Sequence, residues 1–241
     1  MKRVILGIVA VTLMCFVSCK TTDSGNAGAG APSSAKLVAL TFDDGPSDKT
    51  PLVLDKLEKY HVVASFFMVG QMINDDTKPI MDRIVQLNCE VNNHSWAWQS
   101  MNEMSPAEIK ESVSKTSAAI KKYTGKAPMF FRPPNLATSD VMYRNVGLPQ
   151  CGGVLGMDWA GCNTSAEDRA NNVLRSIQDG SIVLLHCTQP DPHPTPEALD
   201  ILIPELQKQG YEFVTVSELF RRKGVKPNPK ADFIWTTVAK E

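Results

Sequence analysis

The sequence has almost no excess charge of either sign. Its 241 residues include 25 Lys and Arg against 26 Asp and Glu, which gives a formal net charge of −1. A domain that binds nucleic acid usually carries a basic excess, so the composition excludes that partner for the chain as a whole. Cysteine is scarce: six residues without a C-x-x-C pair exclude a disulfide scaffold and a zinc ribbon. The remaining composition, 43% hydrophobic and 21% charged, is typical of a single globular domain.

The sequence also lacks an apolar run long enough for a permanent membrane span. Two basic residues precede an apolar segment at 4–17, which would extend about 21 Å as a helix, short of a hydrocarbon core of about 30 Å. This pattern is typical of a secretory signal peptide. Phe16–Cys19 resembles the lipobox of bacterial lipoproteins, in which the cysteine is lipidated; an ordinary signal cut nearby is the alternative. We expect a signal peptide at 1–18 and a lipid anchor at Cys19.

A stretch rich in Gly, Ala, Ser and Thr follows the predicted anchor. Residues 19–35 show no apolar periodicity, which predicts a flexible tether. The protein is then expected outside the cytoplasm of a bacterium, membrane-anchored on the periplasmic or cell-surface side, and monomeric. Four further cysteines would lie in this disulfide-permissive compartment, and three connectivities stay open. They are Cys89, Cys151, Cys162 and Cys187.

From residue 36 onward, β-rich runs alternate with helical patterns. Strands are predicted at 36–42, 63–69, 90–94, 129–132, 154–159, 181–186 and 211–216, and helices at 50–60, 76–87, 105–123, 166–178 and 195–209. Such alternation predicts βα units around a parallel sheet. No G-x-G-x-x-G follows the first strand, which removes the main indication of a Rossmann-type domain. Residues 36–222 are fewer than the roughly 250 of a standard barrel, so we predict one distorted barrel. Residues 223–241 are predicted to be a C-terminal extension packed on its outside.

Unusual polar groups stand at the ends of five predicted strands. In a parallel barrel these ends meet at one face, where active sites form. The segments are Thr41–Pro46 (TFDDGP), His94–Trp96, Arg132–Pro134, Asp158–Trp159 and Leu184–His186. Each taken alone is as well explained by a turn or a buried structural group. Five on one predicted face indicate a site.

In this order, the five segments resemble the motifs of the polysaccharide deacetylases of carbohydrate esterase family four. The resemblance covers nearly all of residues 36–220. It implies a distorted parallel (β/α) barrel of seven or eight strands. It also implies an enzyme that uses a divalent metal, most often zinc, to hydrolyse N-acetyl, or sometimes O-acetyl, groups on a polymer such as peptidoglycan, chitin or xylan. The expected partner is therefore an acetylated glycan.

The resemblance also assigns roles to residues. Amide hydrolysis needs a base for water, an electrophile for the carbonyl and an acid for the leaving group. The resemblance implies that Asp43 is the base, kept ionised by Arg132, and that His186 is the acid, oriented by Asp158. Asp44 and His94 become metal ligands. The substrate-binding set is Pro133, Pro134, Asn135, Trp159, Leu184 and Trp96.

One position departs from the family pattern. The second motif normally reads His-x-x-x-His, but Trp98 stands where the second histidine is expected, and its side chain has no lone pair for a metal. Metal binding is therefore expected to be weak or absent, since a catalytic zinc usually has three protein ligands. The enzyme could use two ligands, recruit His193 as a substitute, or work without tight metal.

A fourth reading makes the barrel a catalytically impaired carbohydrate-binding protein. In it Trp96, Trp98 and Trp159 would form a stacking surface for sugars. A pure binder has no need of both Asp43 and His186, so the retained acid and base favour an enzyme.

Overall fold

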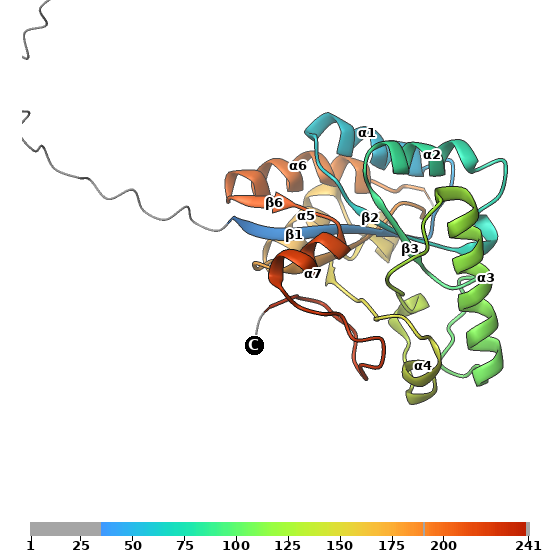
Figure 1. The fold of residues 1–241 in the computed structure, drawn as a ribbon. Helices are drawn as coiled ribbons and strands as arrows, with labels where there is room; N and C mark the ends of the chain where they lie inside the picture. Colours follow the sequence, from blue (N-terminus) through green and yellow to red (C-terminus); the bar gives the residue numbers. More distant parts are fainter. Residues whose placement is uncertain (1–34, 190, 240–241) are drawn as a thin grey trace, which may run out of the picture. The chain divides into compact units, whose positions relative to one another are not determined.

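The computed structural model describes residues 35–189 and 191–239 (Figure 1). The predicted signal peptide, Cys19 and all but the last residue of the predicted tether lie outside the described residues. These residues form six strands: β1 (Lys36–Asp43), β2 (Ser65–Met68), β3 (Glu90–Asn93), β4 (Val154–Leu155), β5 (Ser181–His186) and β6 (Tyr211–Phe213). Seven α-helices accompany them in the described ranges: α1 (Thr50–Tyr60), α2 (Lys78–Gln86), α3 (Pro106–Thr124), α4 (Asp140–Asn145), α5 (Ala166–Leu174), α6 (Thr195–Lys208) and α7 (Val216–Lys223). Short 3₁₀ turns are η1 (Gly70–Met72), η2 (Pro134–Leu136) and η3 (Asp158–Asn163).

All paired strands run parallel, and the sheet curls into a distorted barrel. The order is β3-β2-β1-β5-β4, and β6 pairs with the start of β1. Single bridges from Asn93 to Phe131 and from Phe131 to Gln150 continue the wall from β3 toward the segment that leads into β4. The predicted parallel α/β barrel is thus confirmed.

The number of strands is smaller than expected. The described residues form six strands where seven or eight were predicted, because the strand expected at 129–132 is reduced to bridges at Phe131. Pro128 and Pro133 flank this segment. Proline has no N–H to donate, so the hydrogen-bond ladder cannot extend beyond a few residues here.

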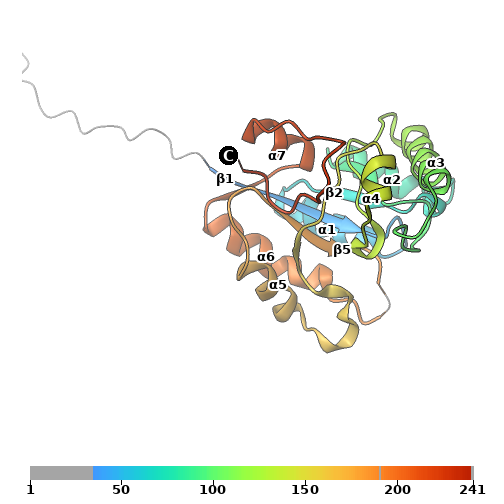
Figure 2. The ribbon, with the colours of Figure 1, turned by 90° about the horizontal axis from the view of Figure 1, so that it is seen from below.

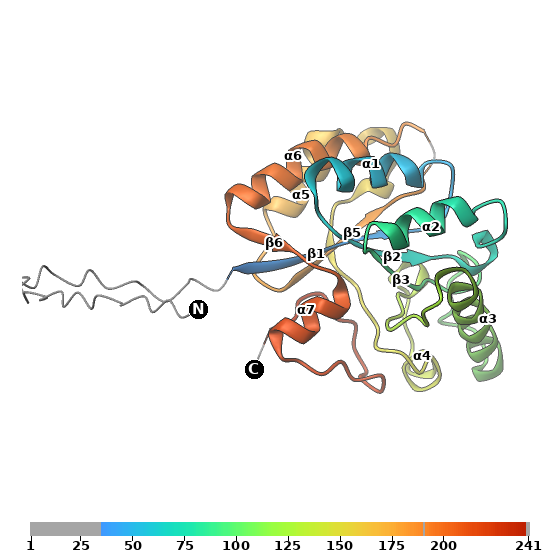
Figure 3. The same ribbon diagram turned by 45° about the horizontal axis from the view of Figure 1, so that its top comes forward.

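The central strand β1 is buried on both faces, as a parallel strand in a helix-covered sheet should be. Alternate residues Val38, Leu40 and Phe42 pack in one cluster with the inner faces of α1 and α6. The intervening Leu37 and Ala39 belong to a second cluster that includes residues of β2, β5 and α7. Figure 3 shows α1, α2, α5 and α6 together along one side of the sheet. The helices therefore hold the carboxyl ends of β1 and β5 in place from outside.

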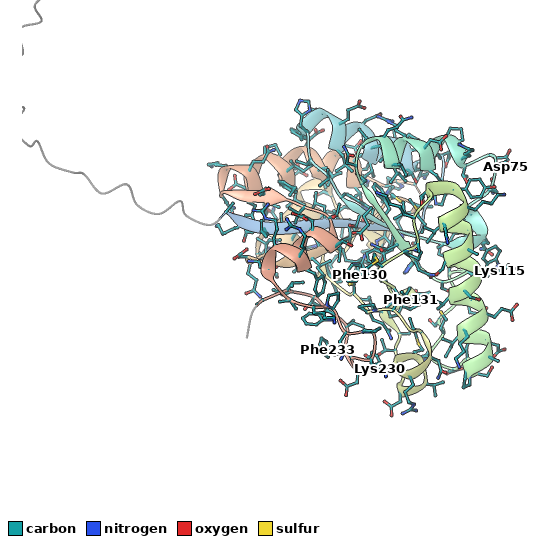
Figure 4. The ribbon with its side chains drawn as sticks, viewed as in Figure 1. Asp75, Lys115, Phe130, Phe131, Lys230 and Phe233 are labelled. Atoms are coloured by element: carbon teal, nitrogen blue, oxygen red, sulfur yellow. The ribbon has the colours of Figure 1, made fainter. Side chains whose placement is uncertain are left out.

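The C-terminal segment belongs to the barrel wall, which corrects the expected external packing. The boundary predicted at 222 falls inside α7, a helix that the sequence did not predict; Thr215 caps it and Gly224 ends it. Beyond it, Trp235 bridges Cys151, Thr237 bridges Ser181, and Val238 is fully buried. Figure 2 shows this segment running beside α7, and Figure 4 labels Lys230 and Phe233 on it. Helix α4 is likewise an element that the sequence did not predict.

The described cysteines carry no disulfide. Cys89, Cys151 and Cys187 are free thiols, and burial raises the pKa of Cys89 to about 11 and of the other two to about 12. Each of the three complete pairings considered for four cysteines would join two of these three, so the structure contradicts all of them. None of the helices among the described residues is both long and apolar enough for a membrane span.

Candidate active site

A cavity of about 600 Å³ opens at the carboxyl ends of the strands. It is lined by Asp43, Asp44, His94, Trp98, Pro133, Pro134, Asn135, Leu136, Leu155, Trp159, Leu184, His186 and Gln189. The parallel register places Asp43 of β1 directly beside His186 of β5. Most of the residues predicted from the five motifs therefore meet here, with Arg132 and Asp158 buried behind the lining.

The carboxylate of Asp43 is held by a buried guanidinium. Arg132 is fully buried, and its Nη1 donates to Asp43 Oδ1 at 2.6 Å and to the Thr41 hydroxyl at 2.7 Å. Its other nitrogens donate to the carbonyls of Cys151 and Gly152. The carboxylate compensates the buried guanidinium, and the pairing fixes the orientation of both groups. Oδ2 of Asp43 is left for other partners.

The neighbouring strand β5 ends in an imidazole that is paired with a second buried carboxylate. Nδ1 of His186 donates to Asp158 Oδ1 at 2.8 Å, and the His186 backbone N–H donates to Asp158 Oδ2 at 2.7 Å. Burial lowers the pKa of His186, but the charge of Asp158 outweighs it and raises the pKa to about 9. Burial likewise opposes ionisation of Asp158, whose pKa is nonetheless lowered by the charge of His186. At neutral pH the imidazole is therefore protonated, and its Nε2 can deliver a proton to the cavity.

Asp44 and His94 form a pair of metal-type donors at the cavity floor. Nε2 of His94 lies 3.5 Å from Asp44 Oδ1, while its Nδ1 contacts the Arg132 carbonyl at 2.8 Å. Because a carbonyl only accepts, Nδ1 carries the proton and Nε2 can present its lone pair. Burial lowers the pKa of His94, but Asp43 and Asp44 outweigh it and the net shift is upward, so a proton competes for this site.

These two donors suit a divalent cation with several water ligands. The part of the chain that the structure describes contains no group of three or more His, Cys, Asp or Glu side chains arranged to hold a metal ion. Asp44 adopts a left-handed conformation (φ 74°), and a side chain at Gly45 would approach Cys187 Sγ to 2.7 Å. The Asp-Asp-Gly sequence thus lets the chain turn sharply while its two carboxylates point to different partners.

Trp96 does not line the cavity, contrary to the prediction. It lies in a separate surface hollow with Glu108 and Glu111, and the Lys115 ammonium sits 3.8 Å from its ring centroid. Figure 4 labels Lys115 on α3. The left-handed Ser95 (φ 69°) turns the chain between His94 and Trp96, which sends the two side chains to different sites. Trp98, 41% exposed, lines the cavity instead.

His193 is not directed at the predicted metal ligands. Its Nε2 contacts the backbone carbonyl of His186 at 3.0 Å and its Nδ1 contacts Arg169 Nη1 at 3.3 Å, so both ring nitrogens are engaged elsewhere. The structure therefore does not support the alternative in which His193 substitutes as a metal ligand. Gln189, which the motifs did not indicate, does reach the site, because its amide donates to Asp44 Oδ2 at 3.2 Å. Its only sequence signal was its position three residues after His186.

This arrangement of base, acid and metal-type donors at the mouth of a distorted parallel barrel defines a hydrolase of the carbohydrate esterase type. The sequence profile described as polysaccharide deacetylase matches residues 30–150. The chain belongs to the polysaccharide deacetylase family.

Named relatives extend the similarity over the whole described barrel. A bifunctional xylanase/deacetylase of Pseudobutyrivibrio xylanivorans is 44% identical over 218 residues, covering 90% of this chain and 36% of that protein. A peptidoglycan-N-acetylglucosamine deacetylase of Bacillus cereus is 34% identical, covering 80% of this chain and 92% of that protein. A family 4 acetyl xylan esterase from Clostridium thermocellum, solved with a cobalt ion, is 52% identical with a TM-score of 0.82, covering 84% of this chain and 99% of that one. The chain thus spans about a third of the first relative's length.

We expect substitutions of Arg132 and Asp43 to have non-additive effects on the free energy of unfolding. Arg132→Met leaves the Asp43 carboxylate buried without its partner and should lower the free energy of unfolding by about 3–5 kcal/mol. Adding Asp43→Asn removes that uncompensated charge and should recover part of the loss. Urea unfolding of the two single variants and the double variant gives the coupling energy. Strictly additive losses would contradict the pairing.

The pKa of His186 should be measurable in metal-free protein. NMR titration of its ring protons is expected to give about 9, and Asp158→Asn should move the value down toward the ordinary 6.5. Because the folded-state pKa is raised, the pair's contribution to stability is complete below about 6.5 and is lost as the pH rises through 9. A titration near 6.5 in the unsubstituted protein would contradict the assigned Asp158 interaction.

Proposed function

We propose that this chain removes O-acetyl groups from acetylated xylan. The observation that carries the proposal is that one cavity holds a carboxylate bound to a guanidinium and a protonated imidazole bound to a carboxylate: Asp43 next to Arg132, and His186 next to Asp158. A base and an acid at these positions can hydrolyse either an ester or an amide. The choice of xylan rests on the relatives, since a xylanase/deacetylase and an acetyl xylan esterase are 44% and 52% identical to this chain. The sequence alone had favoured an N-acetyl substrate.

The residues can divide the hydrolysis between them. Asp43 takes a proton from water, and the resulting hydroxide attacks the acetyl carbonyl carbon. The tetrahedral intermediate then expels the sugar oxygen, to which His186 Nε2 gives a proton, so that acetate and a free sugar hydroxyl leave. Asp158 holds the imidazole in the tautomer and orientation that this transfer needs. A site that retained only binding would need neither the base nor the acid, so the carbohydrate-binding alternative is not favoured.

A divalent cation, with zinc the expected ion, would be held by Asp44 and His94. When bound, it would polarise the acetyl carbonyl as a Lewis acid. We propose that the binding is weak, because two protein ligands are fewer than the usual three of a catalytic zinc site and the raised pKa of His94 favours a competing proton.

Two tryptophans provide walls suited to an uncharged sugar chain. Trp98 and Trp159 are 41% and 43% exposed and line the same cavity, with Leu155 and Leu184 as apolar surface for an acetyl methyl group. Asn135, in a left-handed conformation (φ 56°), donates its amide to the Trp98 carbonyl at 3.3 Å and to Ser100 Oγ at 3.0 Å. We propose that Asn135 fixes the loop that carries Trp98, so that this indole serves as a stacking surface in place of a metal ligand.

Acetate release tests the proposed substrate. The full chain should release acetate from acetylated xylan faster than from N-acetylglucosamine oligomers, and Asp43→Asn should lower the rate on the order of 10²-fold or more. Trp96→Ala, outside the cavity, is the matched control for Trp98→Ala, which should raise KM for the polymer. A higher rate on the N-acetylated oligomers would reject the ester substrate and leave an amide deacetylase. No release from either glycan would reject the enzyme.

Metal affinity tests the role of Trp98. Trp98→His introduces an imidazole at the cavity and should tighten zinc binding by at least about 10-fold, since even an outer-shell partner is worth 10–100-fold. Trp96→His makes the same chemical change outside the cavity and should leave the affinity as it is. Calorimetric zinc titration of metal-free proteins gives the comparison. A full, tight zinc equivalent in the unsubstituted protein would contradict weak binding.

We also propose that the protein is an exported lipoprotein, anchored at Cys19, and a monomer. Incorporation of a labelled fatty acid in a bacterial host should be lost in Cys19→Ser and retained in Cys15→Ser, because only the first would remove the acylated residue. Labelling that persists in Cys19→Ser would reject the anchor. Light scattering of the detergent-solubilised protein would reject the monomer if it gave twice the chain mass.

A further inference from the structure

A second buried guanidinium lies behind the acid side of the cavity. Arg169 of α5 has no exposed surface, and the mechanism assigns it no part. Its Nη1 donates to the Thr195 hydroxyl at 2.9 Å and approaches His193 Nδ1 to 3.3 Å, while its Nε contacts Thr164. Thr195 in turn bonds to the carboxylate of Asp158, and His193 contacts the backbone carbonyl of His186. Arg169 is therefore connected to the proposed acid by two routes.

The first route ends on the carboxylate that orients the imidazole. A guanidinium can only donate, so Thr195 Oγ1 accepts from Arg169 and must direct its own proton elsewhere. That proton goes to Asp158 Oδ2, 2.8 Å away. Asp158 thus receives three hydrogen bonds, two of them from His186 itself. Because both carboxylate oxygens accept hydrogen bonds, Asp158 has one orientation that satisfies the two donors of His186 and the hydroxyl of Thr195.

The second route ends on the backbone of the acid. Nε2 of His193 lies 3.0 Å from the His186 carbonyl oxygen. The carbonyl only accepts and Arg169 only donates, so His193 must carry its proton on Nε2 and accept at Nδ1. Burial lowers the pKa of His193, which keeps the ring neutral and able to play both parts. His193 therefore links Arg169 to the main chain of His186.

We propose that Arg169, Thr195 and His193 are positioning residues for the deacetylation, which together set the angle at which His186 presents its proton to the leaving oxygen. One cation fixes the imidazole through Asp158 and fixes its backbone through His193. Small misplacements of a catalytic group are costly in rate, which gives such a network a catalytic consequence beyond packing. The inference rests on the proposed function, since it assigns a proton transfer to His186.

Two substrates that differ in their leaving group can distinguish a positioning role of Thr195 from a purely structural one. Acetylated xylan expels a poor leaving group that needs the proton of His186, whereas 4-nitrophenyl acetate expels a phenolate that needs none. Thr195→Val keeps the shape of the side chain and removes the hydroxyl. In the full chain, Thr195→Val should lower the ratio of kcat on acetylated xylan to kcat on 4-nitrophenyl acetate by roughly 10- to 100-fold. This loss is a part of the roughly 10²- to 10⁴-fold rate enhancement that a positioned acid supplies. KM should change little.

Two further variants complete the comparison. Thr195→Ser retains the hydroxyl and should restore the ratio of the two kcat values. Thr116→Val is the matched control: Thr116 is equally buried, but its hydroxyl has no hydrogen-bond partner, so its removal should leave the ratio unchanged. Equal losses on both substrates in Thr195→Val, with a lowered Tm, would overturn the proposal in favour of a purely structural role. An unchanged ratio would also overturn it.

A spectroscopic measurement keeps this test separate from the test of the substrate. The proton on His186 Nδ1, shared with Asp158, should give a downfield proton NMR resonance in the metal-free protein. Thr195→Val should shift or broaden that resonance, and Thr195→Ser should preserve it. If acetylated xylan is not a substrate but the resonance responds in this way, the proposed function fails and the positioning stands. An unaltered resonance in Thr195→Val overturns the positioning whatever the substrate.

Discussion

The buried ion pair between Arg132 and Asp43 is the interaction on which the rest of the site depends. Arg132 lies inside the barrel with no exposed surface, over the ring of Phe67 at 4.0 Å, and bonds to β1 and to the segment before β4. A buried pair of this kind is often no more stable than apolar residues of the same volume. Its presence is therefore better explained by what it supplies: a carboxylate held in one orientation at the mouth of the barrel, with its second oxygen left for other partners.

Strand register brings the other groups to that carboxylate. Asp43 ends β1 at the level of His186 in β5 on one side and of Phe67 in β2 on the other. His94 follows β3 and turns back toward Asp43 and Asp44, with its ring oriented by the Arg132 carbonyl. A shift of one residue in any of these parallel pairs would send the polar side chains to the helix-covered face. The clusters on the two faces of β1 hold the register against such a shift.

One buried guanidinium supports the proposed base and a second supports the proposed acid. Arg132 binds the carboxylate of the proposed base directly, whereas Arg169 reaches the carboxylate that orients the proposed acid through Thr195. Both are inaccessible to solvent, so neither can contact a polymer. The cavity lining combines aromatic and aliphatic side chains with the titratable groups Asp43, Asp44, His94 and His186. The two guanidiniums are thus buried behind the site, and the substrate meets a cavity of mixed polar and apolar character.

The sequence by itself determined the order of βα units and the grouping of Asp43, Asp44, His94, Arg132 and His186, because buried parallel strands are apolar and their polar ends must meet at one edge. Only the tertiary structure decided the rest. Trp96 and Trp98 are two residues apart, yet Trp96 lies in a separate surface hollow and Trp98 lines the cavity. His193 looked like a possible ligand, but its contacts with Arg169, 24 residues earlier, and with the His186 carbonyl direct it away. The tail beyond α7 joined the wall through pairings with residues 84 and 56 positions earlier, at Cys151 and Ser181. Local patterns carry no information about such distant partners.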